Sequence, residues 1–257
     1  MKNSLLKTIT AGVVFSALTL SSQAQVIDKI EKSFDVNAQS QFSLENINGA
    51  VEITSWDQQV IQVVATIKAD DQEDRDRITV DMQQNGRGVK VETRYKKDSS
   101  WGFKNNNNSG DVSYSVMVPA DIDLSSIELV NGSLVIENVH GDINVELVNG
   151  SVKATGLMGS SEISSVNGSI KAKYKSLSDD FEQVKIQTVN GSIKVYLPEN
   201  ISASVDAETL HGSIKNGFGL SNDEDSFMGK NLKGDIGSGD ARISLESVNG
   251  SIKILQN

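Results

Sequence analysis

A motif of Val-Asn-Gly-Ser followed by an apolar residue repeats along this chain and constrains its fold more than any other feature. Between residues 129 and 172 a glycine recurs every nine residues and the full motif every eighteen, and further copies occupy residues 47–53, 189–195, 210–216 and 248–254. A fixed period of this kind is typical of solenoids, in which each repeat packs on its neighbours. The repeat glycines are Gly132, Gly141, Gly150, Gly159, Gly168, Gly191, Gly212 and Gly250.

Asn-Gly is also a strong hairpin signal, so an antiparallel meander is the alternative to a solenoid. Counted from the glycine, positions −2, +2 and +4 are apolar in most copies, and even steps place them on one face of a continuous strand. We call the residues at one motif position in successive copies a column. In a hairpin, the apolar +2 column would face the mostly polar −3 column, and the nearly uniform Val/Leu column at −2 would point away from the core. The columns therefore favour a β-solenoid of nine-residue half-turns.

A continuous strand assigns a side to each motif position. Position −2, which includes Val130 and Val148, is expected in the core, whereas Asn and Ser face outward. The glycine is expected to face inward, at a bend or a close backbone approach. On this interpretation Val148→Asp strongly destabilises the domain and Ser151→Asp is mild.

The regions outside the repeats suggest how the chain is divided. Residues 1–24 read as a secretory signal peptide, with Lys2 and Lys7 before an apolar run and a small-x-small cleavage site at Ser22–Ala24. The alternative, a membrane anchor, needs an apolar run of about 20 residues, which this segment lacks. Residues 25–123 are expected to form an antiparallel short-strand β cap and residues 124–257 the solenoid, the two together making one continuous domain over 25–257.

Composition excludes several classes of function. The chain has no cysteine, which rules out disulfides, cysteine nucleophiles, zinc–thiolate sites and a lipid-modified cysteine. The formal net charge is −10 and there is no basic stretch, which argues against nucleic acid as a partner. No segment beyond the signal approaches a membrane span. A periplasmic or secreted location follows from the expected signal.

No motif points to catalysis, a metal or a cofactor, and we predict none of the three. The chain lacks the nucleophile-elbow, zinc-protease, phosphate-loop and dinucleotide fingerprints. Calcium-binding nonapeptide rolls carry a regular aspartate, which is only sporadic here. His140 and His211 occupy the asparagine position of the motif, so we expect them to replace asparagine in a stacked ladder.

Two features are candidate interaction sites. Trp101 and Phe103 lie in a polar stretch expected to be a long hairpin loop, where exposed aromatics are a common binding device. A lysine stripe at position +3 is the most patterned outward feature, represented by Lys153, Lys171 and Lys194. The stripe is either a solvated face that protects strand edges or a contact surface for anions or polysaccharide.

The segment Glu45–Ile53, the strand that ends in Val118-Pro119 and the serial VNGSIKV-type copies together resemble the putative-adhesin (Toastrack-type) bacterial β-solenoid family, whose function is unassigned. The resemblance implies an extracytoplasmic β-solenoid with an adhesin-like or envelope-associated role, and it supplies no catalytic residues.

The leading hypothesis is an exported, non-enzymatic binding or scaffold module of the cell envelope, with an envelope protein or glycan as its unidentified partner. A polysaccharide-acting β-helix enzyme is the first alternative, and clustered outward carboxylates on one face would favour it. A sensing partner of an envelope-stress regulator is the second. The sequence leaves the oligomeric state open.

Overall fold

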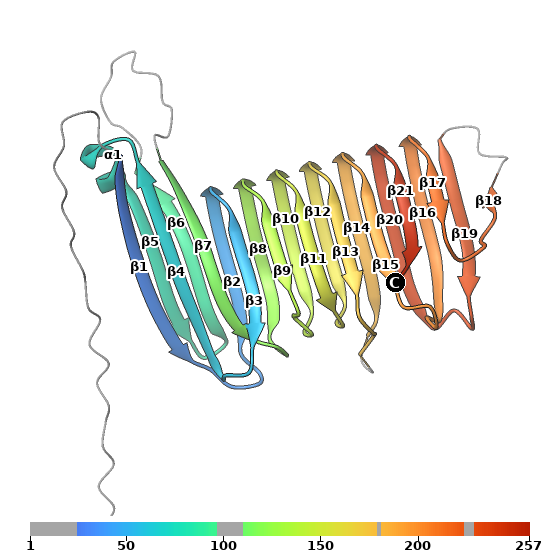
Figure 1. Cartoon of the computed structure of the whole chain (residues 1–257), viewed down its shortest axis with the longest axis horizontal. Helices are drawn as coiled ribbons and strands as arrows, with labels where there is room; N and C mark the ends of the chain where they lie inside the picture. The colour runs from blue at the N-terminus through green and yellow to red at the C-terminus, as the bar shows by residue number, and fades with distance from the viewer. Residues whose placement is uncertain (1–24, 97–109, 179–180, 224–228) are drawn as a thin grey trace, which may run out of the picture.

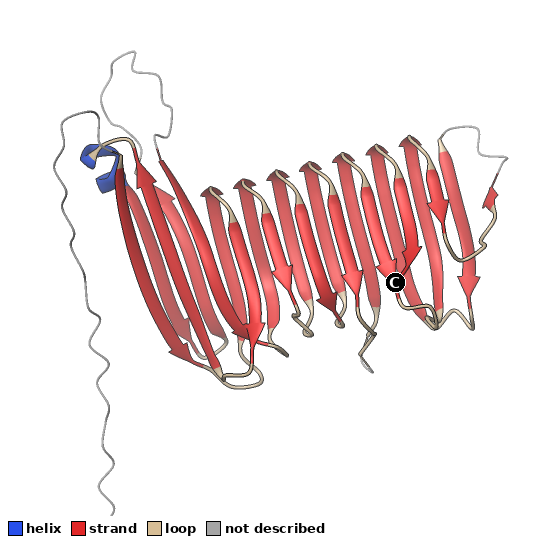
Figure 2. Cartoon of the chain, viewed as in Figure 1, coloured by secondary structure: helices blue, strands red, loops and turns tan. Residues whose placement is uncertain are grey.

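The computed structural model describes residues 25–96, 110–178, 181–223 and 229–257. Strands account for nearly all of the regular structure in these ranges, and they stack side by side into two sheets along one axis (Figures 1 and 2). The predicted β-solenoid with an antiparallel cap at its N-terminal end is confirmed.

The first sheet, called sheet A, has ten strands. Their spatial order is β1 (Val26–Asp35), β4 (Val60–Ala69), β7 (Gly110–Pro119), β3 (Val51–Trp56), β9 (Leu134–Glu137), β11 (Val152–Leu157), β13 (Ile170–Tyr174), β15 (Ile193–Leu197), β21 (Ile252–Gln256) and β17 (Ile214–Asn216).

The second sheet, called sheet B, has eleven strands. Their spatial order is β18 (Asn222–Asp223), β19 (Lys230–Ile236), β16 (Ala203–His211), β20 (Ala241–Asn249), β14 (Gln183–Asn190), β12 (Ser161–Asn167), β10 (Ile143–Asn149), β8 (Asp123–Asn131), β2 (Gln41–Asn48), β6 (Gly88–Tyr95) and β5 (Ile78–Asn85).

Each repeat contributes one strand to each sheet. The Asn-Gly-Ser segment joins the two, as between β10 in sheet B and β11 in sheet A. Equivalent strands of successive coils pair in parallel, with Ile143 opposite Ser161 and Val152 opposite Ile170, an offset of eighteen residues in both sheets. The coil is therefore two nine-residue halves, as the sequence period predicts.

The N-terminal end is built from antiparallel strands. β1 pairs with β4 and β4 with β7 in sheet A, while β5 pairs with β6 in sheet B. The short helix α1 (Gln72–Arg77) lies between β4 and β5, with the Asp71 carboxylate capping its N-terminus by accepting a hydrogen bond from the Asp74 amide. This arrangement covers the end of the stack, as a repeat array requires.

The first coil already lies within residues 25–123. β2 pairs in parallel with β8, and β3 with β9, so the early Ile-Asn-Gly copy is a true repeat. Buried apolar residues from Phe34 to Ile254 form one continuous cluster between the sheets. The division at residue 123 stays a prediction.

The last coil in sequence is not the last coil in space. β20 and β21 lie between the coil of β14 and β15 and the coil of β16 and β17 (Figure 1). The chain first makes β16 and β17 one position farther along. It returns through β19, which pairs antiparallel with β16, and then fills the remaining position with parallel pairing on both sides.

Candidate functional site

The Asn-Gly-Ser segments form the corners at which the chain passes from sheet B to sheet A. A side chain does not fit at these glycines, because a Cβ atom on Gly150 would lie 1.8 Å from the carbonyl oxygen of Gly132 in the neighbouring coil. A Cβ atom on Gly168 or Gly250 would likewise lie 1.7 Å from a glycine carbonyl oxygen of the neighbouring coil. The expected close backbone approach is therefore present. The chain turns there, however, instead of continuing as one strand.

The corner asparagines stack into a hydrogen-bonded ladder along the molecule. The Asn149 side-chain amide donates to the Asn131 Oδ1 atom at 2.9 Å, and Asn167 donates to Asn149 at the same distance. The ladder begins at Asn48 and ends at Asn249. The side-chain amides therefore use their hydrogen-bonding groups on one another, which gives the ladder a structural role. His211 pairs with Asn249 in the strand register, whereas His140 lies 3.4 Å from the Asp121 carboxylate.

Position −3, two residues before the corner asparagine, faces the core. Leu129 and Leu147 are buried there, and later coils place hydroxyl residues in the same column. Thr209 donates from its hydroxyl to the Gly250 carbonyl at 2.8 Å, and Thr188 donates to Gly168 at 3.1 Å. The two threonines face inward at low cost because their hydroxyl groups hydrogen-bond to carbonyl groups of an adjacent corner.

The predicted burial of position −2 is wrong for the Val-Asn-Gly-Ser copies. Their −2 side chains are 40–43% exposed, whereas Val139 and Leu157, at the alternate glycines, are buried as predicted. The physical reason is the turn at Asn-Gly-Ser, which makes −3 and +2 the inward pair, so that −2 points outward from sheet B. The exposed residues are Val130, Val148, Val166, Val189, Leu210 and Val248. We call them the aliphatic ladder.

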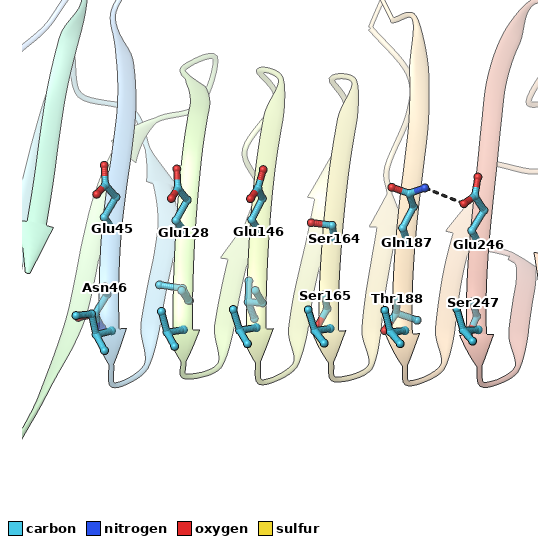
Figure 3. A pocket seen from close by; sticks show the side chains of 18 of the residues that line it. Glu45, Asn46, Glu128, Glu146, Ser164, Ser165, Gln187, Thr188, Glu246 and Ser247 are labelled. Carbon is cyan, nitrogen blue, oxygen red and sulfur yellow. Dashed lines mark hydrogen bonds between the residues drawn. The ribbon is translucent and has the colours of Figure 1, made fainter. Parts of the chain in front are cut away.

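A second outward row lies two residues earlier on the same strands. Figure 3 shows Glu45, Glu128 and Glu146 side by side on adjacent strands, followed along the same row by Ser164, Gln187 and then Glu246. Glu146 lies directly opposite Glu128 in the strand register. We call this row, completed by Glu208, the acidic row.

The acidic row is only partly neutralised by the protein. Glu45 accepts a hydrogen bond from Lys90 at 2.6 Å, which raises the pKa of Lys90, and Glu208 lies 3.5 Å from Lys233. Within the part of the chain that the structure describes, Glu128, Glu146 and Glu246 have no cationic group within 4.0 Å. Like charges on directly opposite strand positions repel each other.

The two rows are the walls of one long groove of ≈ 1140 Å³. It crosses sheet B from β6 to β19, along the axis of the stack, with one acidic and one aliphatic wall. The inward-facing −3 residues between the rows contribute to its floor. Arg94 and Tyr95 lie at one end, and Lys230 and Asn231 at the other. Burial raises the pKa of the Tyr95 hydroxyl to about 12, so this group is neutral at physiological pH.

The lysine stripe lies on the opposite face of the molecule. Lys153, Lys171 and Lys194 are exposed on adjacent strands of sheet A and follow one another in register. Lys253 and Lys215 continue the column. Lys153 lies 3.5 Å from Glu137, and the Lys171 ammonium lies 5.2 Å from the centre of the Tyr196 ring. The structure therefore separates this stripe from the groove.

Two further sequence expectations concern aromatics and metals. Trp101 and Phe103 lie outside the described residues. Among the residues that are described, no three His, Asp or Glu side chains are grouped to hold a metal ion. No helix in the same ranges is long and apolar enough to cross a membrane.

Sequence reasoning missed the groove, although a signal for it is present. An acidic residue two positions before the exposed aliphatic residue recurs in Glu128–Val130, Glu146–Val148, Glu208–Leu210 and Glu246–Val248. The alternation of outward Glu, inward residue and outward aliphatic residue marks two rows on one face, once position −3 is recognised as inward.

Comparison with known proteins agrees with this architecture. The family model described as Toastrack DUF4097 matches residues 106–255, which is more than half of the chain. The chain belongs to the Toastrack DUF4097 family. The resemblance seen in the sequence is thus confirmed. No curated protein matches the chain.

One solved structure of low sequence identity resembles this family member in fold. A putative cell adhesion protein from Clostridium sporogenes is 15% identical with a TM-score of 0.52, over 90% of this chain and 100% of that chain. A putative adhesin from Bacteroides fragilis is 14% identical with a TM-score of 0.42, over 90% of this chain and 97% of that chain. At 15% identity the likeness to the Clostridium sporogenes protein concerns the fold alone.

Proposed function

We propose that this protein is an exported, non-enzymatic, adhesin-like binding module of the bacterial cell envelope, and that the groove on sheet B is its binding surface. The aliphatic ladder is the observation that carries the proposal. Six large aliphatic side chains lie exposed in register along one groove. Contiguous exposed apolar surface of this kind marks interaction sites in soluble proteins. The solved relative from Clostridium sporogenes, whose name refers to cell adhesion, agrees with a binding role.

Export is the part of the proposal that rests on residues 1–24, the expected signal peptide. Cleavage after Ala24 would release a chain that begins at Gln25 into the periplasm or the medium. Fractionation of producing cells, followed by N-terminal sequencing of the protein, tests this directly. A cytoplasmic protein that retains its first residues would contradict export.

Binding through the groove is tested by capture from cell-envelope extracts. The immobilised mature protein is compared with the double variant Val148→Asn/Val166→Asn, which removes two central members of the aliphatic ladder. Lys171→Gln/Lys194→Gln on the opposite face is the matched control. We expect the wild type and the control to retain the same envelope protein or glycan, and the groove variant to lose it. Equal retention by all three proteins would reject the groove as the binding surface.

The acidic row favours polysaccharide hydrolysis as a second candidate. Glu128 and Glu146 lie directly opposite each other on adjacent strands, whose backbones are about 4.8 Å apart, so two carboxylates share one site as in glycosidases. These carboxylates, however, stand side by side on one face, whereas hydrolysis needs a carboxyl group on each side of the scissile bond (Figure 3). We expect no release of reducing ends from envelope polysaccharide. Release that is lost in Glu146→Gln would instead establish the enzymatic function.

A further inference from the structure

The two walls of the groove differ in chemistry, and this difference restricts what the groove accommodates. One wall is aliphatic and the other carries Glu128, Glu146 and Glu246, which have no cationic group within 4.0 Å among the described residues. A ligand that fits both walls has apolar groups on one side and cationic groups on the other. An acidic lipid headgroup would be repelled by the acidic row, and a neutral glycan has no positive charge with which to neutralise it.

An extended peptide meets this requirement through its own geometry. Successive side chains of an extended chain point to opposite sides, so a strand that lies along the groove presents alternate residues to the two walls. Basic residues would face the acidic row while aliphatic residues pack on the ladder. Ile47 in β2, at the same motif position, also lines the groove, so that together with the ladder this row runs to Leu210 in β16 over seven adjacent strands. Six strand spacings measure about 29 Å, which an extended segment of about nine residues spans.

We propose that the groove binds an extended peptide segment in which basic and aliphatic residues alternate. This inference rests on the proposed binding function of the groove and adds the chemical class of its ligand. Neutralisation of the in-register pair Glu128 and Glu146 relieves repulsion that the free protein bears. Binding to the aliphatic ladder removes apolar surface from water. The two contributions are separable, because different side chains make them.

The test is a fluorescence-polarisation titration of the mature protein with labelled peptides of about ten residues, long enough to span the ladder. The probe alternates lysine and valine. One comparison peptide replaces every lysine by glutamate, and another replaces every valine by serine. We expect the lysine–valine peptide to bind best, both substituted peptides to bind more weakly, and the affinity for the first to fall as salt is added.

Protein variants assign the contacts. Glu128→Gln/Glu146→Gln is expected to weaken binding of the lysine–valine peptide about five- to tenfold, from the loss of two charge contacts at a partly exposed site. Val148→Asn/Val166→Asn weakens its binding to a similar or greater degree, and Lys171→Gln/Lys194→Gln leaves it unchanged. Circular dichroism confirms that each variant is folded. Equal binding of the lysine and glutamate peptides, or unchanged binding by the glutamine variant, would overturn the inference.

A neutral environment-sensitive dye separates this inference from the proposed function. Suppose that the dye binds the wild type but not Val148→Asn/Val166→Asn, and that the lysine–valine peptide binds no better than the glutamate peptide. The groove then binds apolar ligands and the peptide assignment is wrong. If neither the dye nor the peptides distinguish that variant from the wild type, both the groove function and the peptide assignment are wrong.

Discussion

Leu147 and Val148 are adjacent aliphatic residues with different surroundings. Leu147 is 3% exposed and points between the sheets, whereas Val148 is 42% exposed and points into the groove. The Asn149-Gly150 corner that follows them fixes this difference, because it forces the chain from one sheet to the other. Hydrophobic character alone therefore does not say which of the two residues stabilises the fold.

Substitution of these neighbours by asparagine separates packing from surface roles. Leu147→Asn removes a buried side chain and buries an amide, so the free energy of unfolding should fall by about 3–5 kcal/mol. Val148→Asn should change it by less than about 1 kcal/mol, since its side chain lies on the surface and is already partly in contact with water. Urea denaturation followed by circular dichroism measures both. Similar large losses of unfolding free energy for the two variants would show that the position −2 side chain is part of the core.

The sequence specified some residue positions and misled at others. The +2 and +4 columns are buried as predicted in nearly every coil, because they lie on regular strands where alternation holds. Position −2 lies next to a corner, and the choice between a straight strand and a turn depends on backbone packing between coils. Residues such as Thr188, whose hydroxyl is satisfied at the corner, made the inward −3 column look polar and therefore outward.

At the scale of one element, the lysine stripe places like charges on neighbouring strands. Lys194 on β15 lies opposite Lys171 on β13 and Lys253 on β21. Like charges directly opposite in a sheet are destabilising. The stripe therefore carries an energetic cost that other residues of the fold offset.

Lys194→Glu should consequently stabilise the protein by about 0.2–1 kcal/mol, because it replaces two repulsive neighbours by attractive ones. The gain should be visible as a higher thermal midpoint at low salt and should shrink as salt is added. Lys194→Gln is the control and should show a smaller gain. A lower midpoint for Lys194→Glu would mean that the lysine makes a stabilising contact that the charge pattern does not reveal.

Strand order was predictable only where the repeat is unbroken. The eighteen-residue period over β8 to β13 specifies neighbours directly. The insertion of β20 and β21 between earlier coils has no such signal, since the motif at Val248 is the same as at Val189 and fits any position in the stack. β20 and β21 take this position because there each of them pairs with a strand on both sides, which leaves no unpaired edge at that point.

At the scale of the whole molecule, rows of opposite charge lie on the two sheets, the acidic row on sheet B and the lysine stripe on sheet A. This separation follows from stacking, because one charged residue in a repeat becomes a row once the coils are in register. The groove likewise forms only when the coils are stacked, because its two walls are rows made of residues from successive coils. No single repeat contains it, which explains why motif searches along the sequence did not find it.

Alkaline pH should unfold the protein through its buried tyrosines. Burial raises the pKa of both Tyr95 and Tyr114 from 10.0 to about 12. Between these values the unfolded chain has lost protons that the folded protein keeps, so the free energy of unfolding falls as pH rises. Below pH 10 this effect is absent. Urea midpoints measured from neutral pH to about pH 11.5 should decline from about pH 10, and the decline should be shallower in Tyr114→Phe. A midpoint independent of pH in this range would contradict the assignment.

The central claim is that the aliphatic ladder is an exposed binding surface, and thiol labelling of single-cysteine variants tests it most directly. The chain has no cysteine, so Val148→Cys and Leu147→Cys each introduce one reporter. In the folded protein we predict rapid maleimide modification of Val148→Cys, protection of Leu147→Cys until denaturant is added, and slowing of the Val148→Cys reaction by the lysine–valine peptide. Equal protection of both thiols, or labelling of Val148→Cys unaffected by any groove ligand, would contradict the account.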